Sequence, residues 1–148
     1  MYGGLFSCLL KDKGMTGVSH AICYGEHKAP FTVGGMAATI RYYEPYLHSK
    51  VPFGRMDELE DALELKKCPC EYCSQIPQIK QKGEQLEIAG KHFLLTRVKE
   101  INDIAIKGVS EVLSKIEQDT KNAEKKDQLG AYSSFYEKFF VWSEILRS

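Results

Sequence analysis

Three cysteines lie within six residues of this chain, in the segment Cys68-Pro-Cys-Glu-Tyr-Cys73, and His92 follows downstream. The C-x-C-x2-C spacing places three thiols in one tight turn. Zinc takes four ligands, with sulfur at about 2.3 Å and imidazole nitrogen at about 2.0–2.1 Å. Three sulfurs from one loop and one histidine from a following helix satisfy that geometry. The sequence therefore predicts a Cys3His zinc site formed by Cys68, Cys70, Cys73 and His92. Because protein side chains fill all four positions, the site would be structural and not catalytic.

Two alternatives to this ligand set stay open. In the first, the three thiols are reduced and hold no metal. In the second, His48 replaces His92 as the fourth ligand. Clustered cysteines in a chain without secretory features bind metal more often than they form disulfides, so we favour zinc.

A second group of reactive side chains lies upstream, at His20, Cys23, Glu26 and His27. A cysteine beside a histidine can act as an activated nucleophile, and a carboxylate can act as a nucleophile or base. No third group that would orient such a base is evident. We therefore expect Cys23 to be a small buried residue and Glu26 to lie at the surface. Glu26 remains the one weak candidate for a catalytic residue.

The composition indicates a folded protein in a reducing compartment. Hydrophobic residues make up 43% of the 148 residues and charged residues 27%, which excludes global disorder. Lysine plus arginine equals aspartate plus glutamate at 20 each, so the net charge gives no argument for nucleic acid or membrane. No apolar run approaches the roughly 18 residues of a membrane span. Five cysteines, three of them clustered, favour a cytoplasmic protein.

Hydrophobic spacing and turn residues predict several short elements before the cysteines. They are a helix at 5–11, strands at 18–24 and 31–33, a helix at 36–48 that Pro45 kinks or ends, a turn at 52–55 and an acidic helix at 56–65.

Longer helices are predicted after the cysteines. From about Lys91 to Ile116, apolar residues recur every three or four positions, which predicts one long helix whose apolar stripe is a core face or a partner seam. Residues 117–128 form a charged run, interpreted as the helix end plus a linker. Residues 131–146 predict a last helix with six aromatic residues, which would pack on the long helix or on another subunit. The predicted fold class is α+β and mostly helical, with a zinc-containing segment at 1–125 and an aromatic helix within 126–148.

The cysteine motif and its surroundings resemble a known enzyme family. C-x-C-x2-C, a polar stretch and then Leu94-Leu-Thr96 on a helix are similar to the zinc module of tRNA-guanine transglycosylases. Gly90-Lys-His-Phe-Leu-Leu-Thr96 looks like the stretch that leads to the family's histidine ligand, and Gly17-Val-Ser-His-Ala-Ile-Cys23 is similar to the strand that carries its nucleophilic aspartate. The resemblance covers roughly residues 15–115. It implies an exchange of guanine for a deazapurine in tRNA or DNA, with the last barrel strand followed by the zinc subdomain.

The chain departs from the family pattern at three points. The family's ligand histidine follows the Leu-Leu-Thr triplet by two residues, where this chain has Val98, so His92 would have to substitute for it. The nucleophilic aspartate is replaced by Ile22, and Glu26 is the nearest carboxylate. A (β/α)8 barrel needs about 200 residues or more, so this chain resembles only the end of such an enzyme. We expect a remnant or subunit that is inactive alone.

Basic residues near the glycine-rich segment and the cysteines are candidates for nucleic-acid binding. Lysine and arginine bind phosphates, and neighbouring tyrosines offer stacking surfaces. The candidate residues are Lys28, Arg41, Lys66 and Lys67. The alternative function is a helical protein-interaction module that zinc stabilises, in which the aromatic helix binds a partner subunit or a second copy of the chain.

Overall fold

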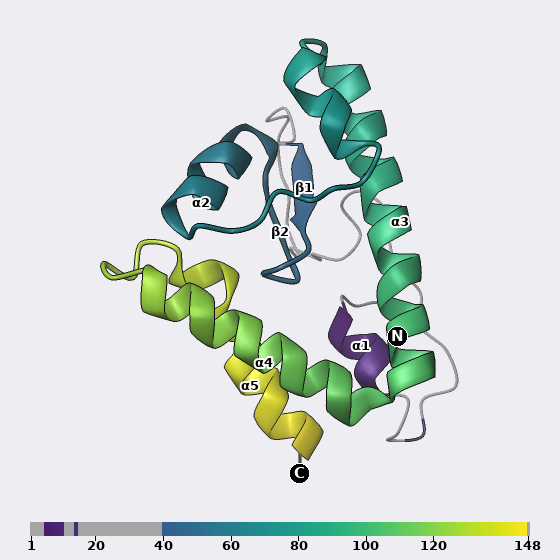
Figure 1. The fold of residues 1–148 in the computed structure, drawn as a ribbon, viewed down its shortest axis with the longest axis vertical. Helices are drawn as coiled ribbons and strands as arrows, with labels where there is room; N and C mark the ends of the chain where they lie inside the picture. The colour runs from purple at the N-terminus through teal and green to yellow at the C-terminus, as the bar shows by residue number, and fades with distance from the viewer. Residues whose placement is uncertain (1–4, 11–13, 15–39, 148) are drawn as a thin grey trace, which may run out of the picture.

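The computed structural model describes residues 5–10, 14 and 40–147, and this part of the chain is mostly helical. Its elements are α1 (Leu5–Leu9), β1 (Arg41–Glu44), β2 (Ser49–Pro52), η2 (Phe53–Arg55), α2 (Met56–Ala62), η3 (Cys73–Gln78), α3 (Lys82–Lys107), α4 (Val109–Lys126), η4 (Ser133–Phe135) and α5 (Glu137–Arg147). Figure 1 shows α3 and α4 meeting at an angle, with the β1–β2 hairpin and α2 inside that angle and α5 beside α4.

The hairpin replaces most of the helix predicted at 36–48, so that prediction is wrong over residues 41–48. β1 and β2 are antiparallel, with Tyr42 opposite Val51 and Tyr43 opposite Lys50. Both tyrosines are buried, one on each face of β1, as in a strand covered on both sides. The 3–4 spacing of apolar residues suggested a helix, but aromatic residues also favour strands, and Pro45 prevents the segment from continuing.

The described residues form two hydrophobic clusters. The first joins the hairpin to α2, η3 and the beginning of α3, and it includes Tyr42, Leu59, Leu63 and Ile76. The second joins α1, the end of α3, α4 and α5 through residues such as Leu9, Ile104, Ile116 and Phe139. The predicted helix at 5–11 and the acidic helix at 56–65 are therefore present as α1 and α2, each slightly shorter than expected.

The predicted long helix is divided in two, and the first part of its predicted apolar stripe is not a core face, which leaves the partner seam as a prediction there. α3 begins at Lys82, nine residues earlier than expected, and ends at Lys107. After Gly108, α4 begins at Val109 and continues through most of the charged run to Lys126. Leu94, Val98 and Ile101 belong to the predicted stripe but are exposed. The buried face of α3 instead carries residues of mixed polarity: Ile88, Ala89, His92, Phe93, Arg97, Glu100 and Ile104.

The aromatic helix contributes to the second cluster of its own chain. α5 contacts α4, and Phe139 and Leu146 are buried between them. Val141 and Ile145 lie on the exposed side of α5. The domain boundary near residue 125 stays a prediction. The strands predicted at 18–24 and 31–33 lie outside the described residues.

Gly108 allows the sharp junction between α3 and α4. Its φ of 83° and ψ of 162° lie in a region that only glycine adopts readily. A Cβ at this position would meet no atom within 4 Å, so the cost of a side chain comes from the backbone alone. We expect Gly108→Ala to lower the free energy of unfolding by about 1–3 kcal/mol in urea titrations.

Gly83→Ala is the matched control for Gly108→Ala. Gly83 is the second residue of α3, and its added Cβ would also meet nothing within 4 Å. Alanine favours helix over glycine by roughly 0.5–1 kcal/mol, so this variant should be slightly more stable than the wild type. Equal stability of the two alanine variants would show that the junction imposes no backbone requirement.

Candidate metal centre

The cysteine loop lies between α2 and η3 and is closed by its own backbone. The Cys70 carbonyl accepts the N–H groups of Cys73 and Ser74 at 3.1 and 3.4 Å, and the Cys73 N–H also lies 3.4 Å from the Cys70 sulfur. Just after Cys73, Ile76 is buried in the first cluster and anchors η3. The turn thus holds the sulfurs together, and the core fixes the position of the turn.

The four predicted ligands meet at one point. The ligand atoms of Cys68, Cys70, Cys73 and His92 all lie within 4.8 Å of one another. His92 Nδ1 lies 3.3 Å from the sulfurs of Cys70 and Cys73 and 4.0 Å from that of Cys68, and the sulfurs of Cys70 and Cys73 are 3.3 Å apart. A tetrahedral zinc site requires S–S separations of about 3.8 Å and S–N separations of about 3.6 Å. The cluster could therefore bind a metal ion after shifts of a few tenths of an ångström.

Residues around the ligands orient His92. Its Nε2 donates a hydrogen bond to the Tyr43 carbonyl at 2.7 Å, which leaves the Nδ1 lone pair directed at the sulfurs. The Tyr42 ring stacks on the imidazole at 4.5 Å between centroids, and its hydroxyl lies 3.2 Å from the Cys73 sulfur. β1 therefore provides the outer layer of the site, and it fixes both the tautomer and the plane of the histidine.

Burial sets the protonation of these groups before any metal binds. It lowers the pKa of His92, which keeps the imidazole neutral and able to donate its lone pair to a metal. It also raises the pKa of the Cys68 and Cys73 thiols and of the Tyr42 phenol. A cation in the cluster would displace the thiol protons, and Tyr42 would then donate to the Cys73 thiolate.

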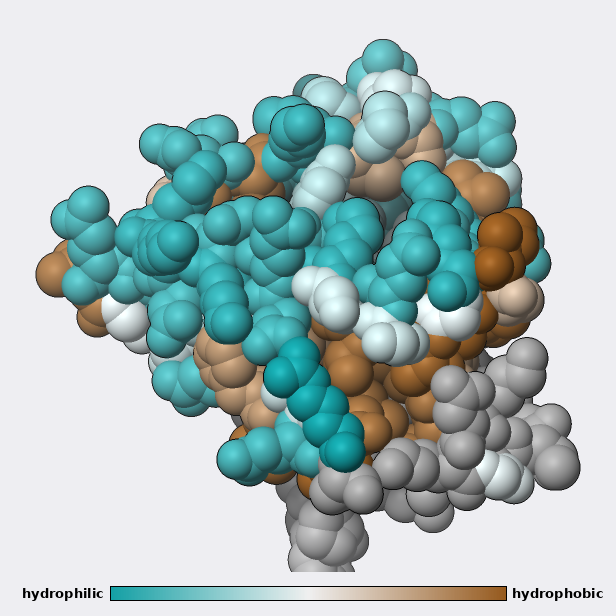
Figure 2. Space-filling view, turned by 60° about the horizontal axis from the view of Figure 1, so that its bottom comes forward, coloured by the Kyte–Doolittle hydropathy of each residue, from teal (hydrophilic) through white to brown (hydrophobic). Residues whose placement is uncertain are grey.

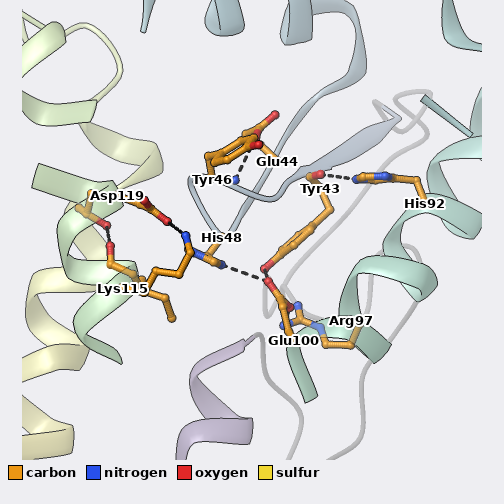
Figure 3. A network of polar contacts seen from close by, with 11 residues as sticks. Tyr43, Glu44, Tyr46, His48, His92, Arg97, Glu100, Lys115 and Asp119 are labelled. Atoms are coloured by element: carbon orange, nitrogen blue, oxygen red, sulfur yellow. Dashed lines mark hydrogen bonds and ion pairs between the residues drawn. The ribbon is translucent and has the colours of Figure 1, made fainter. Parts of the chain in front are cut away.

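A buried polar network extends from His92 to the middle of α3 (Figure 3). The Tyr43 hydroxyl donates to Glu100 Oε1 at 2.7 Å, and Arg97 donates to Glu100 Oε2 at 2.7 Å. His48 Nδ1 lies 3.1 Å from Glu100 Oε1. His48 therefore faces Glu100 and is outside the ligand cluster, so the alternative with His48 as fourth ligand does not describe this structure.

The other candidate residues are scattered or undescribed. Glu26 and Lys28 lie outside the described residues, as do His20, Cys23 and His27. Arg41 is exposed at the beginning of β1. Lys66 and Lys67 are exposed immediately before Cys68, and Lys67 lies 3.8 Å from Asp57. The two lysines are thus adjacent to the metal cluster, but their role in binding stays a prediction.

Sequence reasoning missed the residues that support the cluster. Tyr42, Tyr43 and Glu44 were assigned to a helix, and Arg97 and Glu100 were not singled out. One signal was available: Glu100 follows His92 by eight residues, about two helical turns, and Arg97 shares a helix face with Glu100 because the two are three residues apart. An oppositely charged pair two turns beyond a proposed ligand is compatible with a polar buried face.

The burial of Glu44 predicts an unusual pH dependence of the free energy of unfolding. It is fully buried, its Oε1 accepts the Tyr46 N–H at 3.0 Å, and its Oε2 has no partner among the described residues. Burial, with a smaller contribution from Glu60, raises the pKa of Glu44 from 4.5 to about 8. The folded protein therefore keeps a proton that the unfolded chain has lost, so this carboxyl's contribution to stability decreases as the pH rises from 4.5 through 8.

A Glu44→Gln variant tests this effect, because glutamine resembles the protonated carboxyl. We expect equal unfolding free energies of variant and wild type at pH 5 and a variant more stable by on the order of 2 kcal/mol at pH 8. The exposed Glu144→Gln serves as a control that leaves the pH profile of the wild type unchanged. A constant difference between Glu44→Gln and wild type at both pH values would contradict the assignment.

None of the helices in the described residues is both long enough and apolar enough to cross a membrane. Comparison with models of known protein families, with curated proteins and with solved structures finds no match to this chain. A function for this chain is therefore inferred from the metal cluster and the residues around it.

Proposed function

We propose that the Cys3His cluster binds one zinc ion as a structural metal. The convergence of Cys68, Cys70, Cys73 and His92 is the observation that carries this proposal. Three thiolates and one neutral imidazole suit zinc, and four protein ligands leave no open position for a substrate or water. The zinc would link the cysteine loop to α3 and so hold the hairpin against that helix.

The zinc-stabilised chain would serve base exchange in nucleic acid of the tRNA-guanine transglycosylase type. Two features support this function: the C-x-C-x2-C motif that resembles the family's zinc module, and His92 at the corresponding helix. The chain's own contribution would be to bind tRNA or DNA through exposed basic residues beside the cluster, Lys66 and Lys67 among them. It would not supply the nucleophile, because Ile22 stands where the family has aspartate.

Salt-dependent binding to tRNA and to DNA tests this function. Phosphate contacts give an affinity that falls steeply with salt, with a slope of about −0.7 to −0.9 per contact on logarithmic axes. A Lys66→Ala/Lys67→Ala variant should bind more weakly, with a slope smaller by about two. Arg147→Ala, at the last residue of α5, where the guanidinium pairs with Glu117, is the charge control. Absence of any salt-dependent binding by the zinc-loaded protein would reject the function.

The second candidate function is a protein-interaction module. It is favoured by the apolar residues that α3 and α5 expose, with Leu94, Val98 and Ile101 on α3 and Val141 and Ile145 on α5. On the face that Figure 2 shows, hydrophilic residues dominate and hydrophobic ones gather toward the lower middle. Exposed apolar patches mark contact sites when they are contiguous. Light scattering distinguishes the functions: an interaction module should self-associate, and Val98→Asp or Val141→Asp should abolish that association.

A further inference from the structure

Cys70 and Cys73 lie closer together than a shared zinc ion alone would place them. Their sulfurs are 3.3 Å apart, against about 3.8 Å for two thiolates on one tetrahedral zinc ion. The Cys73 N–H donates to the Cys70 carbonyl at 3.1 Å, which closes the turn from residue 70 to residue 73. Such a turn holds its first and last Cα atoms within about 7 Å, which is the reach of a disulfide. The backbone therefore already brings this pair within range of a sulfur–sulfur bond.

Cys68 takes a different position in the cluster. Its sulfur lies 4.0 Å from His92 Nδ1, whereas the other two sulfurs lie 3.3 Å from that atom. Only Pro69 separates it from Cys70, and the proline ring fixes φ at about −65°. A disulfide between these two cysteines would have to close over that rigid residue. Pairing within the loop therefore favours Cys70 with Cys73 and leaves Cys68 as a thiol.

A pocket gives small molecules access to one member of the pair. It has a volume of about 550 Å³ and lies beside the cluster, between the hairpin loop, α3 and α4. Cys68 and Cys70 line the pocket, and Cys73 is not among its lining residues. The Cys73 sulfur lies instead 3.2 Å from the Tyr42 hydroxyl of the hairpin. A small oxidant can therefore reach Cys70 from the pocket while Cys73 is in contact with the same sulfur.

This arrangement meets the chemical requirements for reversible oxidation. A zinc-bound cysteine is deprotonated, and the thiolate is the form that attacks a peroxide. The product is a sulfenic acid, which condenses with a neighbouring thiol to a disulfide and so avoids irreversible oxidation. Reactive cysteines of this kind are exposed to solvent and adjacent to a second cysteine. Cys70 is partly exposed and has Cys73 at contact distance.

We propose that Cys70 and Cys73 form a reversible disulfide when a peroxide oxidises the cluster, and that this disulfide releases the zinc. The Cys70 thiolate attacks hydrogen peroxide and breaks its O–O bond, and uptake of one proton gives the sulfenic acid and water. The Cys73 thiolate then displaces hydroxide from the Cys70 sulfur, and a second proton converts the hydroxide to water. The two sulfurs lose two electrons in total, and the peroxide gains them.

The disulfide removes two of the four predicted ligands. Cys68 and His92 remain, and two protein ligands do not make the closed tetrahedral site of a structural zinc ion. His92 keeps its hydrogen bond to the Tyr43 carbonyl, but the metal no longer joins the cysteine loop to α3. The proposal rests on the zinc site proposed above and adds that this link responds to oxidation.

Titration of the zinc-loaded protein with hydrogen peroxide tests the proposal. A chromogenic chelator measures the released zinc, and mass spectrometry locates the disulfide. Trypsin should release residues 68–80 as one peptide that contains all three loop cysteines. We expect zinc release in proportion to disulfide formation, and a peptide that has lost two hydrogens and is alkylated on Cys68 alone. Treatment with dithiothreitol and then with zinc should restore the zinc content.

Two variants serve as controls for the pairing. Cys8→Ala, which removes a buried cysteine outside the loop, should respond like the wild type. Cys73→Ser should form no disulfide within the peptide and should accumulate a sulfenic acid on Cys70 that dimedone traps. The wild-type peptide decides the pairing even where this variant fails to fold. Zinc release without a disulfide, or a disulfide that includes Cys68, Cys8 or Cys23, would overturn the proposal.

The zinc content before oxidation separates this proposal from the zinc function. If the protein contains zinc but peroxide forms no disulfide between Cys70 and Cys73, the redox proposal fails and the structural zinc stands. If the protein contains no zinc but forms this disulfide reversibly, the cysteine pair stands, and the zinc function fails together with the release step.

Discussion

A Cys70→Ser variant is expected to lose the zinc ion that we propose for the wild type and with it much of the cooperative unfolding transition. Cys70 makes two of the three shortest contacts in the cluster, at 3.3 Å to the Cys73 sulfur and to His92 Nδ1, and Cys73 is equally close to His92. A serine hydroxyl is a poor substitute for a thiolate as a zinc ligand. Because metal binding and folding are coupled, we expect a loss of several kcal/mol in unfolding free energy. Elemental analysis and circular dichroism of both proteins measure the two effects.

The control for the metal prediction is Cys8→Ala, which removes a buried cysteine in the second cluster, away from the metal site. This variant should keep about one zinc per chain whatever its effect on packing. Treatment of the wild type with a strong chelator should reproduce the Cys70→Ser phenotype, and added zinc should reverse it. A wild-type protein that is folded and contains no zinc would contradict the prediction.

Replacing Glu100 with glutamine should cause the second large effect, a loss of about 3 kcal/mol in unfolding free energy. The carboxylate is buried and accepts from Arg97 and from the Tyr43 hydroxyl, both at 2.7 Å. Glutamine keeps the size but removes the charge opposite Arg97, and its amide nitrogen would face a donor. A buried charge whose counter-ion is removed is strongly destabilising. Urea titration of the zinc-loaded proteins measures the loss.

Glu87→Gln is the matched control on the same helix. Glu87 is exposed and pairs with Lys91 four residues away, in the manner of surface pairs that contribute little to stability. This variant should unfold at nearly the same urea concentration as the wild type. Similar midpoints for Glu100→Gln and the wild type would show that the buried network does not hold the hairpin on α3.

Much of the site could be predicted from the sequence, because its ligands are encoded locally. Three cysteines in one turn are close together in any fold that forms the turn, and the structure confirms that His92 joins them. The short helices at α1 and α2 also followed from local apolar spacing and glycine or proline boundaries. The nucleic-acid residues and the transglycosylase-like function stay predictions, since they depend on a ligand.

The hairpin and the break at Gly108 could not be predicted by the same reasoning. Residues 41–48 have a helix-like apolar spacing, and only pairing with residues 49–52 makes the extended conformation favourable. Gly108 is one of several glycines in the chain, and nothing in its neighbours required the positive φ that separates α3 from α4. In both places, contacts between distant residues outweighed the weak local preferences.

The sequence alone therefore determined the ligand types, their spacing and the predominance of helices. These depend on the chemistry of single side chains and on local periodicity. Only the tertiary structure decided which face of α3 is buried, because that choice depends on what packs against it. Tyr42 and Tyr43 of the hairpin provide a stacking ring, a carbonyl and a hydroxyl for His92 and Glu100, so polar residues turn inward. Leu94 and Val98, which their hydrophobicity alone would have placed in the core, remain at the surface.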